Sequence, residues 1–299
     1  MRGFVMLALV LVLLAGCAAE SDETNVSQPS DTDSTANSIE RIVTIGPSNT
    51  EIVVALGLGE KIVAADAFSF DVEGLPAHVP TNLDMLALDA EHLLSLMPDI
   101  VFITGIAMAG GTDDPLAPVS AAGINVVYVP SSDSVAAVIA DILSIADALG
   151  VRESGEVLVA NMQSEIEAVR EISMTMSLLR TVYFELDPDW LVTLGSGTFV
   201  NELINIAGGV NIFADHEGWL STSAEVILQL NPDVILTSAD YTPDPVGEIL
   251  ARPGFGVVTA VQDQNVHLIT ANYVSRPSHN ITKALWEIAR AIYPEYFPG

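Results

Sequence analysis

The sequence of 299 residues predicts an α/β fold in two lobes, with mainly parallel sheets and a long helix between them. The first observation is that short β-branched runs alternate with segments of helical periodicity, which favours βα units and a parallel sheet. The second is a helix, Pro-Asp and strand unit that occurs twice. In the first part of the chain we predict strands at 41–45, 62–65, 100–104 and 126–129 and helices at 49–56 and 83–96.

The repeated unit reads EHLLSLMPDIVFIT at 91–104 and EVILQLNPDVILTS at 225–238. Each copy is typical of an amphipathic helix that stops at Pro-Asp and leads into a buried strand. Such a unit is also a common local solution in α/β proteins, but two copies on either side of a long helical segment indicate two lobes of related construction. Ligands in such folds bind beyond the carboxyl ends of the strands. We therefore expect a ligand cleft between the lobes.

The middle of the chain has helical spacing through 134–149 and again, after Gly150, through 153–173. Strand patterns then return at 181–186, 234–237 and 266–269, and a last helix is expected at 280–292 before Tyr293-Pro294. We place the first lobe at 39–150, the interlobe helix at 151–179 and the second lobe at 180–299.

The N-terminal segment is predicted to direct export. Residues 1–16 combine Arg2 with an apolar run at 4–14, which is too short to span a bilayer but fits a signal peptide. The run ends in Leu14-Ala15-Gly16-Cys17, which resembles the bacterial lipobox. The resemblance implies that the Cys17 thiol carries a lipid and that residues 17–38, rich in Ser, Thr, Asp and Asn, form a flexible linker. The alternative is an ordinary secretory signal cut near Ala18 or Ala19, which would discard Cys17.

Composition excludes several classes of function. The net charge is −29, from 39 acidic and 10 basic residues, so nucleic acid and anionic lipid headgroups are poor partners. This acidity serves solubility or reflects adaptation to high salt. Cys17 is the only cysteine, so the exported body folds without disulfides. Because the chain also lacks a nucleophile elbow and a phosphate-binding loop, we expect no enzyme activity.

Several motifs in one order resemble the metal-chelate solute-binding proteins of ABC importers, which bind iron-siderophores, haem or cobalamin. The motifs, which together run from about 39 to 296, are RIVTIGPSNTE at 41–51, the segment from 83 to PDIV at 98–101, GSGTFVNELINIAGGVNI at 195–212, Trp219, PD at 232–233 and RPGF at 252–255. The resemblance implies two α/β lobes on one rigid long helix with little hinge motion. It also implies a monomer without an intrinsic cofactor, which delivers its ligand to a permease driven by a cytoplasmic ATPase.

The resemblance further implies an acidic residue on each lobe that pairs with arginines of the permease. On the first lobe this position falls at Asp113 or Asp114, and on the second at Glu202. Carboxylates that face Arg side chains steer docking more than they add affinity. With a lipid on Cys17, the protein would work on the outer face of the cell membrane or in the periplasm.

Loops that follow strands supply the candidate ligand contacts, and aromatic side chains among them suit a wide, flat ligand. The candidates are Ser48, Asn49, Phe68, Met108, Trp190, Trp219, Tyr241, Tyr273 and Arg276. Ser48 or Asn49 could instead cap a helix, Trp219 could plug the core, and Arg276 could form a salt bridge.

The absence of other arginines near Arg276 counts against a triply anionic catecholate as the ligand, since such a ligand usually needs several cations. We therefore expect a ferric siderophore of lower charge or a corrinoid such as cobalamin. A haem receptor stays open, since a His, Tyr or Met could ligate iron. A bare-metal receptor is a weaker alternative, because His216 with Asp215 and Glu217 lacks a familiar zinc spacing, and no metal ligands are assigned. Outside binding proteins, the alternative is an adhesive surface lipoprotein.

Overall fold

The computed structural model describes residues 38–105 and 114–298. Residues Ile39–Gly299 form one compact unit, while the predicted signal peptide, Cys17 and all of the linker except Ser38 lie outside the described residues. In the described part of the chain, no helix is both long and apolar enough to cross a bilayer.

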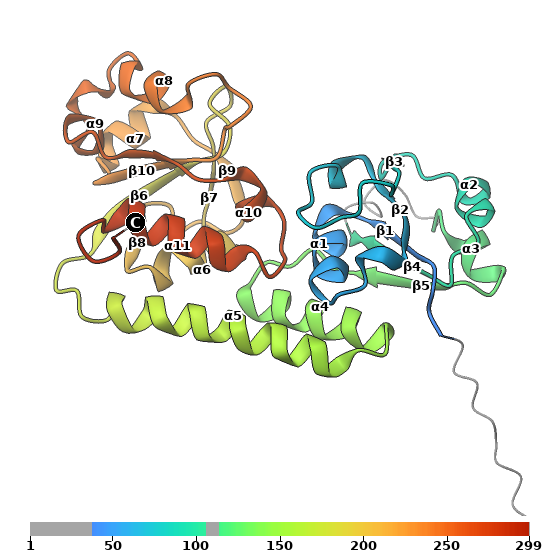
Figure 1. Ribbon diagram of the computed structural model, residues 1–299. Helices are drawn as coiled ribbons and strands as arrows, with labels where there is room; N and C mark the ends of the chain where they lie inside the picture. The colour runs from blue at the N-terminus through green and yellow to red at the C-terminus, as the bar shows by residue number, and fades with distance from the viewer. Residues whose placement is uncertain (1–37, 106–113, 299) are drawn as a thin grey trace, which may run out of the picture. The chain divides into compact units, whose positions relative to one another are not determined.

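The first lobe is built on a five-stranded parallel sheet in the order β3-β2-β1-β4-β5 (Figure 1). Its strands are β1 Ile42–Ile45, β2 Ile62–Asp66, β3 Thr81–Leu83, β4 Ile100–Thr104 and β5 Asn125–Val129, and its helices are α1 Pro47–Ala55, α2 Ala90–Ser95 and α3 Ala117–Ala121. Because the chain order reverses between β1 and β4, the carboxyl ends of these two strands form the switch point where doubly wound sheets bind ligands.

The turn after β1 requires a glycine. Gly46 has a φ of 107°, and a Cβ there would lie 2.9 Å from Cβ and Cγ2 of Thr104 at the end of β4. Only glycine adopts this conformation and this close approach without strain. Pro47 then starts α1 with a φ already suited to a helix.

Two helices follow the first sheet and form the connection between the lobes. α4, Val135–Ala148, is capped by the Ser134 hydroxyl, and α5, Arg152–Ser173, begins after a turn at Gly150. The two pack closely, because a Cβ at Gly155 would lie only 2.5 Å from Cβ of Ala146. α5 also contacts α6 and α11 of the second lobe (Figure 1). α5 lies within 151–179, the range in which we expected the interlobe helix, and ends at Ser173.

The second lobe has a four-stranded parallel sheet in the order β11-β10-β6-β8 and a small antiparallel pair, β7-β9. The strands are β6 Arg180–Glu185, β7 Val192–Leu194, β8 Gly209–Asn211, β9 Trp219–Ser221, β10 Val234–Thr237 and β11 Val266–Leu268. The helices are α6 Phe199–Ile206, α7 Ala224–Leu230, α8 Pro245–Ala251, α9 Thr259–Gln262, α10 Ala271–Ser275 and α11 Ile281–Ile292.

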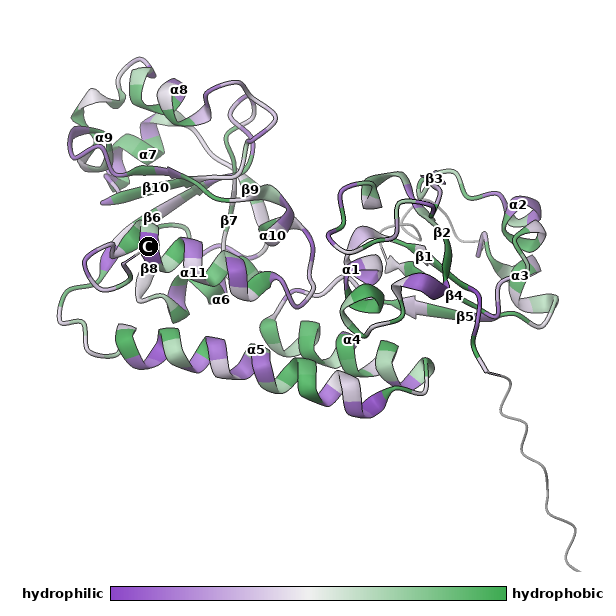
Figure 2. Cartoon of the chain, in the orientation of Figure 1, coloured by the Kyte–Doolittle hydropathy of each residue, from purple (hydrophilic) through white to green (hydrophobic). Residues whose placement is uncertain are grey.

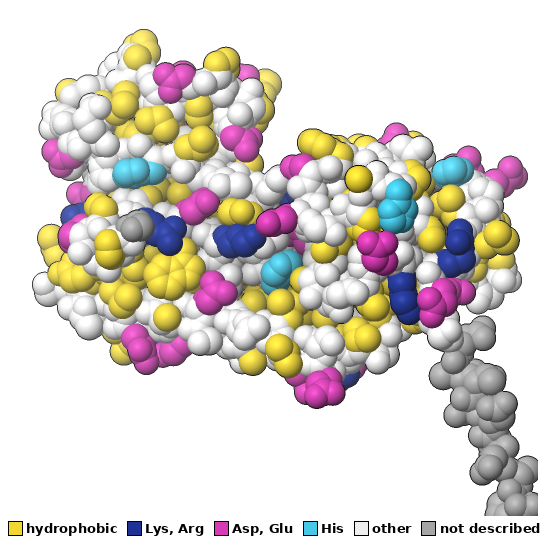
Figure 3. All heavy atoms as spheres, in the orientation of Figure 1, with side chains coloured by type: hydrophobic (Ala, Val, Ile, Leu, Met, Phe, Trp, Pro, Cys, Tyr) yellow, Lys and Arg dark blue, Asp and Glu magenta, His cyan; other side chains and the backbone are white. Residues whose placement is uncertain are grey.

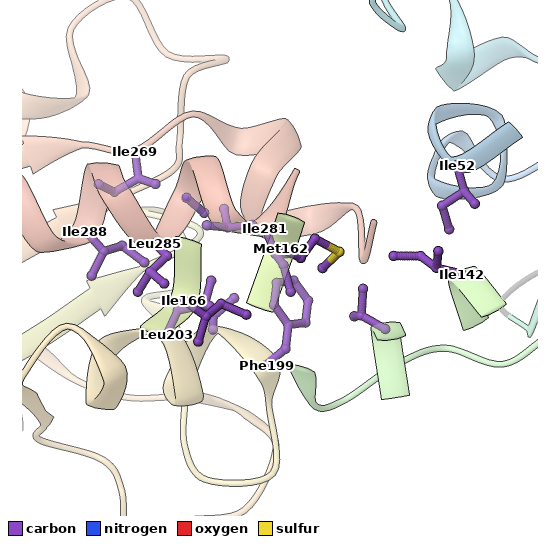
Figure 4. Close-up of a cluster of buried hydrophobic side chains, with 14 of the residues drawn as sticks. Ile52, Ile142, Met162, Ile166, Phe199, Leu203, Ile269, Ile281, Leu285 and Ile288 are labelled. Atoms are coloured by element: carbon purple, nitrogen blue, oxygen red, sulfur yellow. The ribbon is translucent and has the colours of Figure 1, made fainter. Parts of the chain in front are cut away.

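One continuous apolar cluster runs from the first sheet across α4 and α5 into the second lobe. Figure 4 shows part of it, with Ile52 of α1 and Ile142 of α4 on one side and Ile166 of α5, Leu203 and Leu285 on the other. In Figure 2, α4 is coloured mostly hydrophobic, while hydrophobic and hydrophilic residues alternate along α5. Burial of these side chains fixes both lobes on the α4-α5 pair.

Acidic side chains are scattered over the face seen in Figure 3 rather than gathered in one patch.

The prediction of a helix over 83–96 is wrong at its start. Leu83 ends β3, a turn follows in which the Asp84 carboxylate accepts a hydrogen bond from the Leu86 amide at 2.9 Å, and α2 begins only at Ala90. Asp89 caps that helix by accepting from the amides of the next turn. The three-residue strands β3, β7, β8 and β9 were not predicted, because runs this short show no clear periodicity. Trp219, expected in a loop, begins β9.

Candidate ligand-binding site

A cavity of about 360 Å³ lies at the carboxyl ends of the first sheet's strands and takes its opposite wall from the second lobe. Its lining residues are Gly46, Pro47, Ser48, Met85, Thr104, Ser131, Ser132, Leu186, Phe199, Trp219, Val274, Ser275, Arg276 and Pro277. A depression of about 470 Å³ beside α1 and α5 has no strand-end residue in its lining. The cavity between the lobes is therefore the candidate site, as the sequence predicted for a two-lobed fold.

The loop at Gly46 and Ser48 is held in place by a buried carboxylate. Asp66, fully buried at the end of β2, accepts hydrogen bonds from the Gly46 amide at 2.9 Å, the Phe68 amide at 2.9 Å and the Ser69 hydroxyl at 2.8 Å. A buried carboxylate with three donors is well satisfied. The network fixes the backbone that forms this wall of the cavity.

A second buried carboxylate lies behind the Ser132 side of the cavity. The Ser132 hydroxyl donates to Asp141 of α4, and both residues are buried. Burial raises the pKa of Asp141, although the hydrogen bond from Ser132 acts in the opposite direction. Ser132 is thereby positioned by α4 as well as by β5.

The second lobe contributes most of the apolar wall. Leu186 follows β6, Phe199 starts α6 and Trp219 starts β9, while Val274 lies in α10. Trp219 keeps 54% of its surface exposed, so part of its indole is available to a ligand. An aromatic face of this kind stacks on planar ligands.

Arg276 lines the cavity, but its guanidinium is already paired. It donates to Glu51 Oε1 at 3.2 Å, to Asp71 Oδ1 at 2.8 Å and to the Phe68 carbonyl at 3.0 Å, all on the first lobe. Arg276 therefore forms the salt bridge that we gave as the alternative to ligand contact. It also lines the cavity.

The remaining lining is polar without charge. Ser48, Thr104, Ser131, Ser132 and Ser275 supply five hydroxyls, and among the described lining residues Arg276 is the only charged side chain. No His, Tyr or Cys is part of the described lining, and Met85 is its one thioether. Nor does any group of three or more His, Cys, Asp or Glu suited to a metal ion occur in the described ranges.

The structure brings three of the predicted contacts to the cavity: Ser48, Trp219 and Arg276. Asn49 is fully buried and donates to the Ile45 carbonyl at 3.0 Å, so it is structural. Neither Ser48 nor Asn49 caps α1, since Gly46 occupies that position without a side-chain bond. Met108 lies outside the described residues.

Four predicted aromatic contacts do not line the cavity. Phe68 and Trp190 are 55% and 75% exposed and are not among the lining residues, and Tyr241 donates to Asp187 at 3.0 Å. Tyr273 packs against the core and lies under the ammonium group of Lys283. Each of the four does follow a strand, as predicted, but the direction of a loop side chain depends on tertiary packing.

The residues that sequence reasoning missed are mostly small or apolar: Met85, Thr104, Ser131, Ser132, Leu186, Phe199, Val274, Ser275 and Pro277. Thr104 ends β4, and the two serines follow β5 closely. Their place at strand ends was the available signal.

The predicted docking acids stay predictions. Asp113 lies outside the described residues. Asp114 accepts from the Leu116 amide at 2.8 Å and the Tyr128 hydroxyl at 2.7 Å, and Glu202 accepts from the Val135 amide at the start of α4 at 2.8 Å.

His279, three residues after Arg276, makes the folding stability depend on pH. Burial, with a smaller contribution from Lys283, lowers its pKa from 6.5 to about 4. Because the unfolded chain binds this proton more readily than the folded one, stability should be lost as the pH falls from 6.5 to 4, by at most about 3 kcal/mol. Urea unfolding of the wild type and of His279→Gln between pH 6.5 and pH 4 measures this loss of stability. The wild type should lose more stability than the variant, and parallel curves would contradict the assignment.

Comparison with known proteins identifies the family to which this chain belongs. A family model described as periplasmic binding protein matches residues 42–273, well over half of the chain. The chain belongs to the periplasmic binding protein family. Members of this family are solute-binding transport proteins and not enzymes, and no intrinsic cofactor is indicated.

Relatives of this periplasmic binding protein agree in type. It is 30% identical to the uncharacterized ABC transporter substrate-binding lipoprotein YvrC of Bacillus subtilis, over 97% of this chain and 96% of that protein. It is 26% identical to the vitamin B12-binding protein of Vibrio cholerae, over 83% of this chain and 87% of that one. The solved periplasmic heme-binding protein RhuT from Roseiflexus sp. RS-1 is 28% identical, with a TM-score of 0.73 over 86% of this chain and 98% of that chain.

This periplasmic binding protein is therefore an extracytoplasmic substrate-binding protein of an ABC transporter, working with a membrane permease and its ATPase. The two-lobed α/β fold with mainly parallel sheets that the sequence predicted is confirmed.

Proposed function

We propose that this protein captures a metal chelate without net negative charge, a corrinoid first and a ferric hydroxamate second, and delivers it to the permease. The observation that carries this proposal is the cavity wall itself. It combines apolar side chains, five hydroxyls and one arginine whose charge is already paired within the protein.

A corrinoid suits this wall because its flat macrocycle offers apolar faces and its rim carries uncharged amides. The exposed face of Trp219 can stack on the macrocycle, and the hydroxyls of Ser48 and Thr104 can bond the amides. The volume of about 360 Å³ is near the lower end of small-molecule sites, so a corrinoid would extend beyond the cavity. The similarity to a vitamin B12-binding protein supports this order of candidates.

A ferric hydroxamate is favoured by the same uncharged donors, since hydroxyls can bond the oxygens that surround the iron. A triply anionic catecholate would need several cations, and the described lining offers only a paired one. Haem, the ligand named for RhuT, carries two carboxylates and needs an axial ligand, for which the described lining offers the thioether of Met85.

The proposal is tested with residues 39–299, which form one compact unit. The protein is titrated by calorimetry with cyanocobalamin, a ferric trihydroxamate, a ferric tricatecholate and haem. We expect one-to-one binding of cyanocobalamin or the hydroxamate in the micromolar range or tighter, and much weaker binding of the other two. Absence of binding by both uncharged chelates would reject the proposal, and tight binding of haem alone would make the protein a haem receptor.

We also propose that the Cys17 thiol carries a lipid that holds the protein at the membrane beside its permease. The lipobox-like Leu14-Ala15-Gly16-Cys17 supports this, and the relative YvrC is named a lipoprotein. Expressed in a bacterial host, the wild-type protein should pellet with membranes, while Cys17→Ala should appear in the soluble or secreted fraction. Equal membrane association of both proteins would contradict the anchor.

A further inference from the structure

The pairing of Arg276 bears on which ligand charge the cavity accepts. Its side chain is only 8% exposed, and three of its N–H bonds point to the first lobe, two of them to carboxylates. Glu51 comes from α1, and Asp71 follows the short turn after β2. The arginine on the cavity wall is therefore neutralised by residues that do not line the cavity.

The two carboxylates are themselves held in place by the second lobe. Glu51 Oε2 accepts from the Ser278 hydroxyl and, at 2.9 Å, from the Asn280 amide. Asp71 Oδ2 accepts from the Asn272 amide at 2.7 Å. Burial by itself would raise the pKa of Asp71, but the hydrogen bonds from Arg276 and Asn272 and the charge of Arg276 lower it on balance. Asp71 is thus ionised at neutral pH.

The cluster carries two carboxylates for one guanidinium, so an ionised cluster has a net charge of −1. Charges near a partly buried wall act on a ligand more strongly than charges in open water. A carboxylate or catecholate group that enters the cavity would meet a cation with its charge already compensated and one excess negative charge nearby. An uncharged chelate meets no such cost, and a cationic one gains.

We propose that Glu51 and Asp71 set the charge selectivity of the cavity by holding Arg276, so that anionic chelates are rejected and uncharged or cationic ones are admitted. This inference rests on the proposed function, in which the cavity binds a metal chelate. It assigns a role in specificity to two residues that need not touch the ligand.

The test uses pairs of chelates that share one scaffold and differ in charge. One pair is cyanocobalamin and its monocarboxylic acid, and the other is ferrioxamine B and its succinylated, negatively charged derivative. Calorimetry on residues 39–299 gives the ratio of affinities within each pair. The variants are Asp71→Asn and Glu51→Gln. The matched control is Glu73→Gln, since Glu73 is 91% exposed, lies two residues from Asp71 and loses the same charge without touching Arg276.

For the wild type we expect the less negative member of each pair to bind at least about tenfold more tightly. Asp71→Asn and Glu51→Gln should each reduce that ratio by about tenfold, whereas Glu73→Gln should leave it within about twofold. Asp71 has a side chain that is 34% exposed, so its variant keeps the test valid if Glu51→Gln folds poorly.

A ratio that is unchanged in Asp71→Asn, or that changes equally in Glu73→Gln, would overturn the charge-selectivity role while leaving the proposed function intact. Failure of the wild type to bind any of the four chelates would instead reject the proposed function, and this inference with it.

Discussion

Replacing Glu51 by alanine should lower the free energy of unfolding by about 3–5 kcal/mol. Glu51 is 6% exposed and accepts hydrogen bonds from Arg276, Ser278 and Asn280, which lie on the other lobe. Its removal leaves a buried guanidinium with one carboxylate fewer and two buried polar groups without their partner. Such losses are far larger than the loss of an exposed ion pair.

Equilibrium unfolding in urea measures this effect, and the neighbouring Glu73→Ala is the control. Within the described ranges Glu73 bonds one side chain, that of Lys283 at 3.4 Å, and it is exposed, so its loss should cost less than about 1 kcal/mol. We expect Glu51→Ala to lose at least about 2 kcal/mol more of its free energy of unfolding than Glu73→Ala. A Glu51→Ala protein within about 1 kcal/mol of the wild type would show that the cross-lobe cluster contributes little.

Replacing Trp219 by alanine should weaken binding of an uncharged chelate by about 10- to 100-fold. Trp219 lines the cavity with part of its indole exposed, and aromatic anchors of this kind supply much of the affinity in small-molecule sites. Stability should change little, because the side chain is 54% exposed.

Trp190 is the matched control for this experiment, since it has the same side chain, is 75% exposed and does not line the cavity. Calorimetric affinities of Trp190→Ala and the wild type should agree within about twofold. Equal losses in both tryptophan variants would mean that the indoles act through general surface effects, and a loss in Trp190→Ala alone would place the ligand elsewhere.

Much of the fold could be predicted from sequence because its central strands are buried on both faces. The runs at β1, β4 and β10 are apolar except for one threonine in each and are buried at every position, as expected for parallel sheets covered by helices. The strands β7, β8 and β9 have three residues each, too few for an alternating pattern to appear.

The site was only partly predictable, because its geometry depends on residues far apart in the chain. Arg276 could be singled out as a rare cation, but its partner Glu51 lies 225 positions away, and nothing local indicates the pairing. Trp190 and Trp219 were both candidates in sequence, and only tertiary packing places Trp219 alone at the cavity. Gly46 and Asp66 likewise act through a contact that spans 20 positions.

The position of the metal in a crystal of the loaded protein would test directly whether the cavity between the lobes binds the chelate. Residues 39–299 would be crystallised with cyanocobalamin or a ferric hydroxamate, and anomalous scattering would locate the cobalt or the iron. We expect one metal peak at the cavity lined by Ser48, Thr104 and Trp219. A peak elsewhere on the protein, or no metal in crystals grown at saturating chelate, would contradict it.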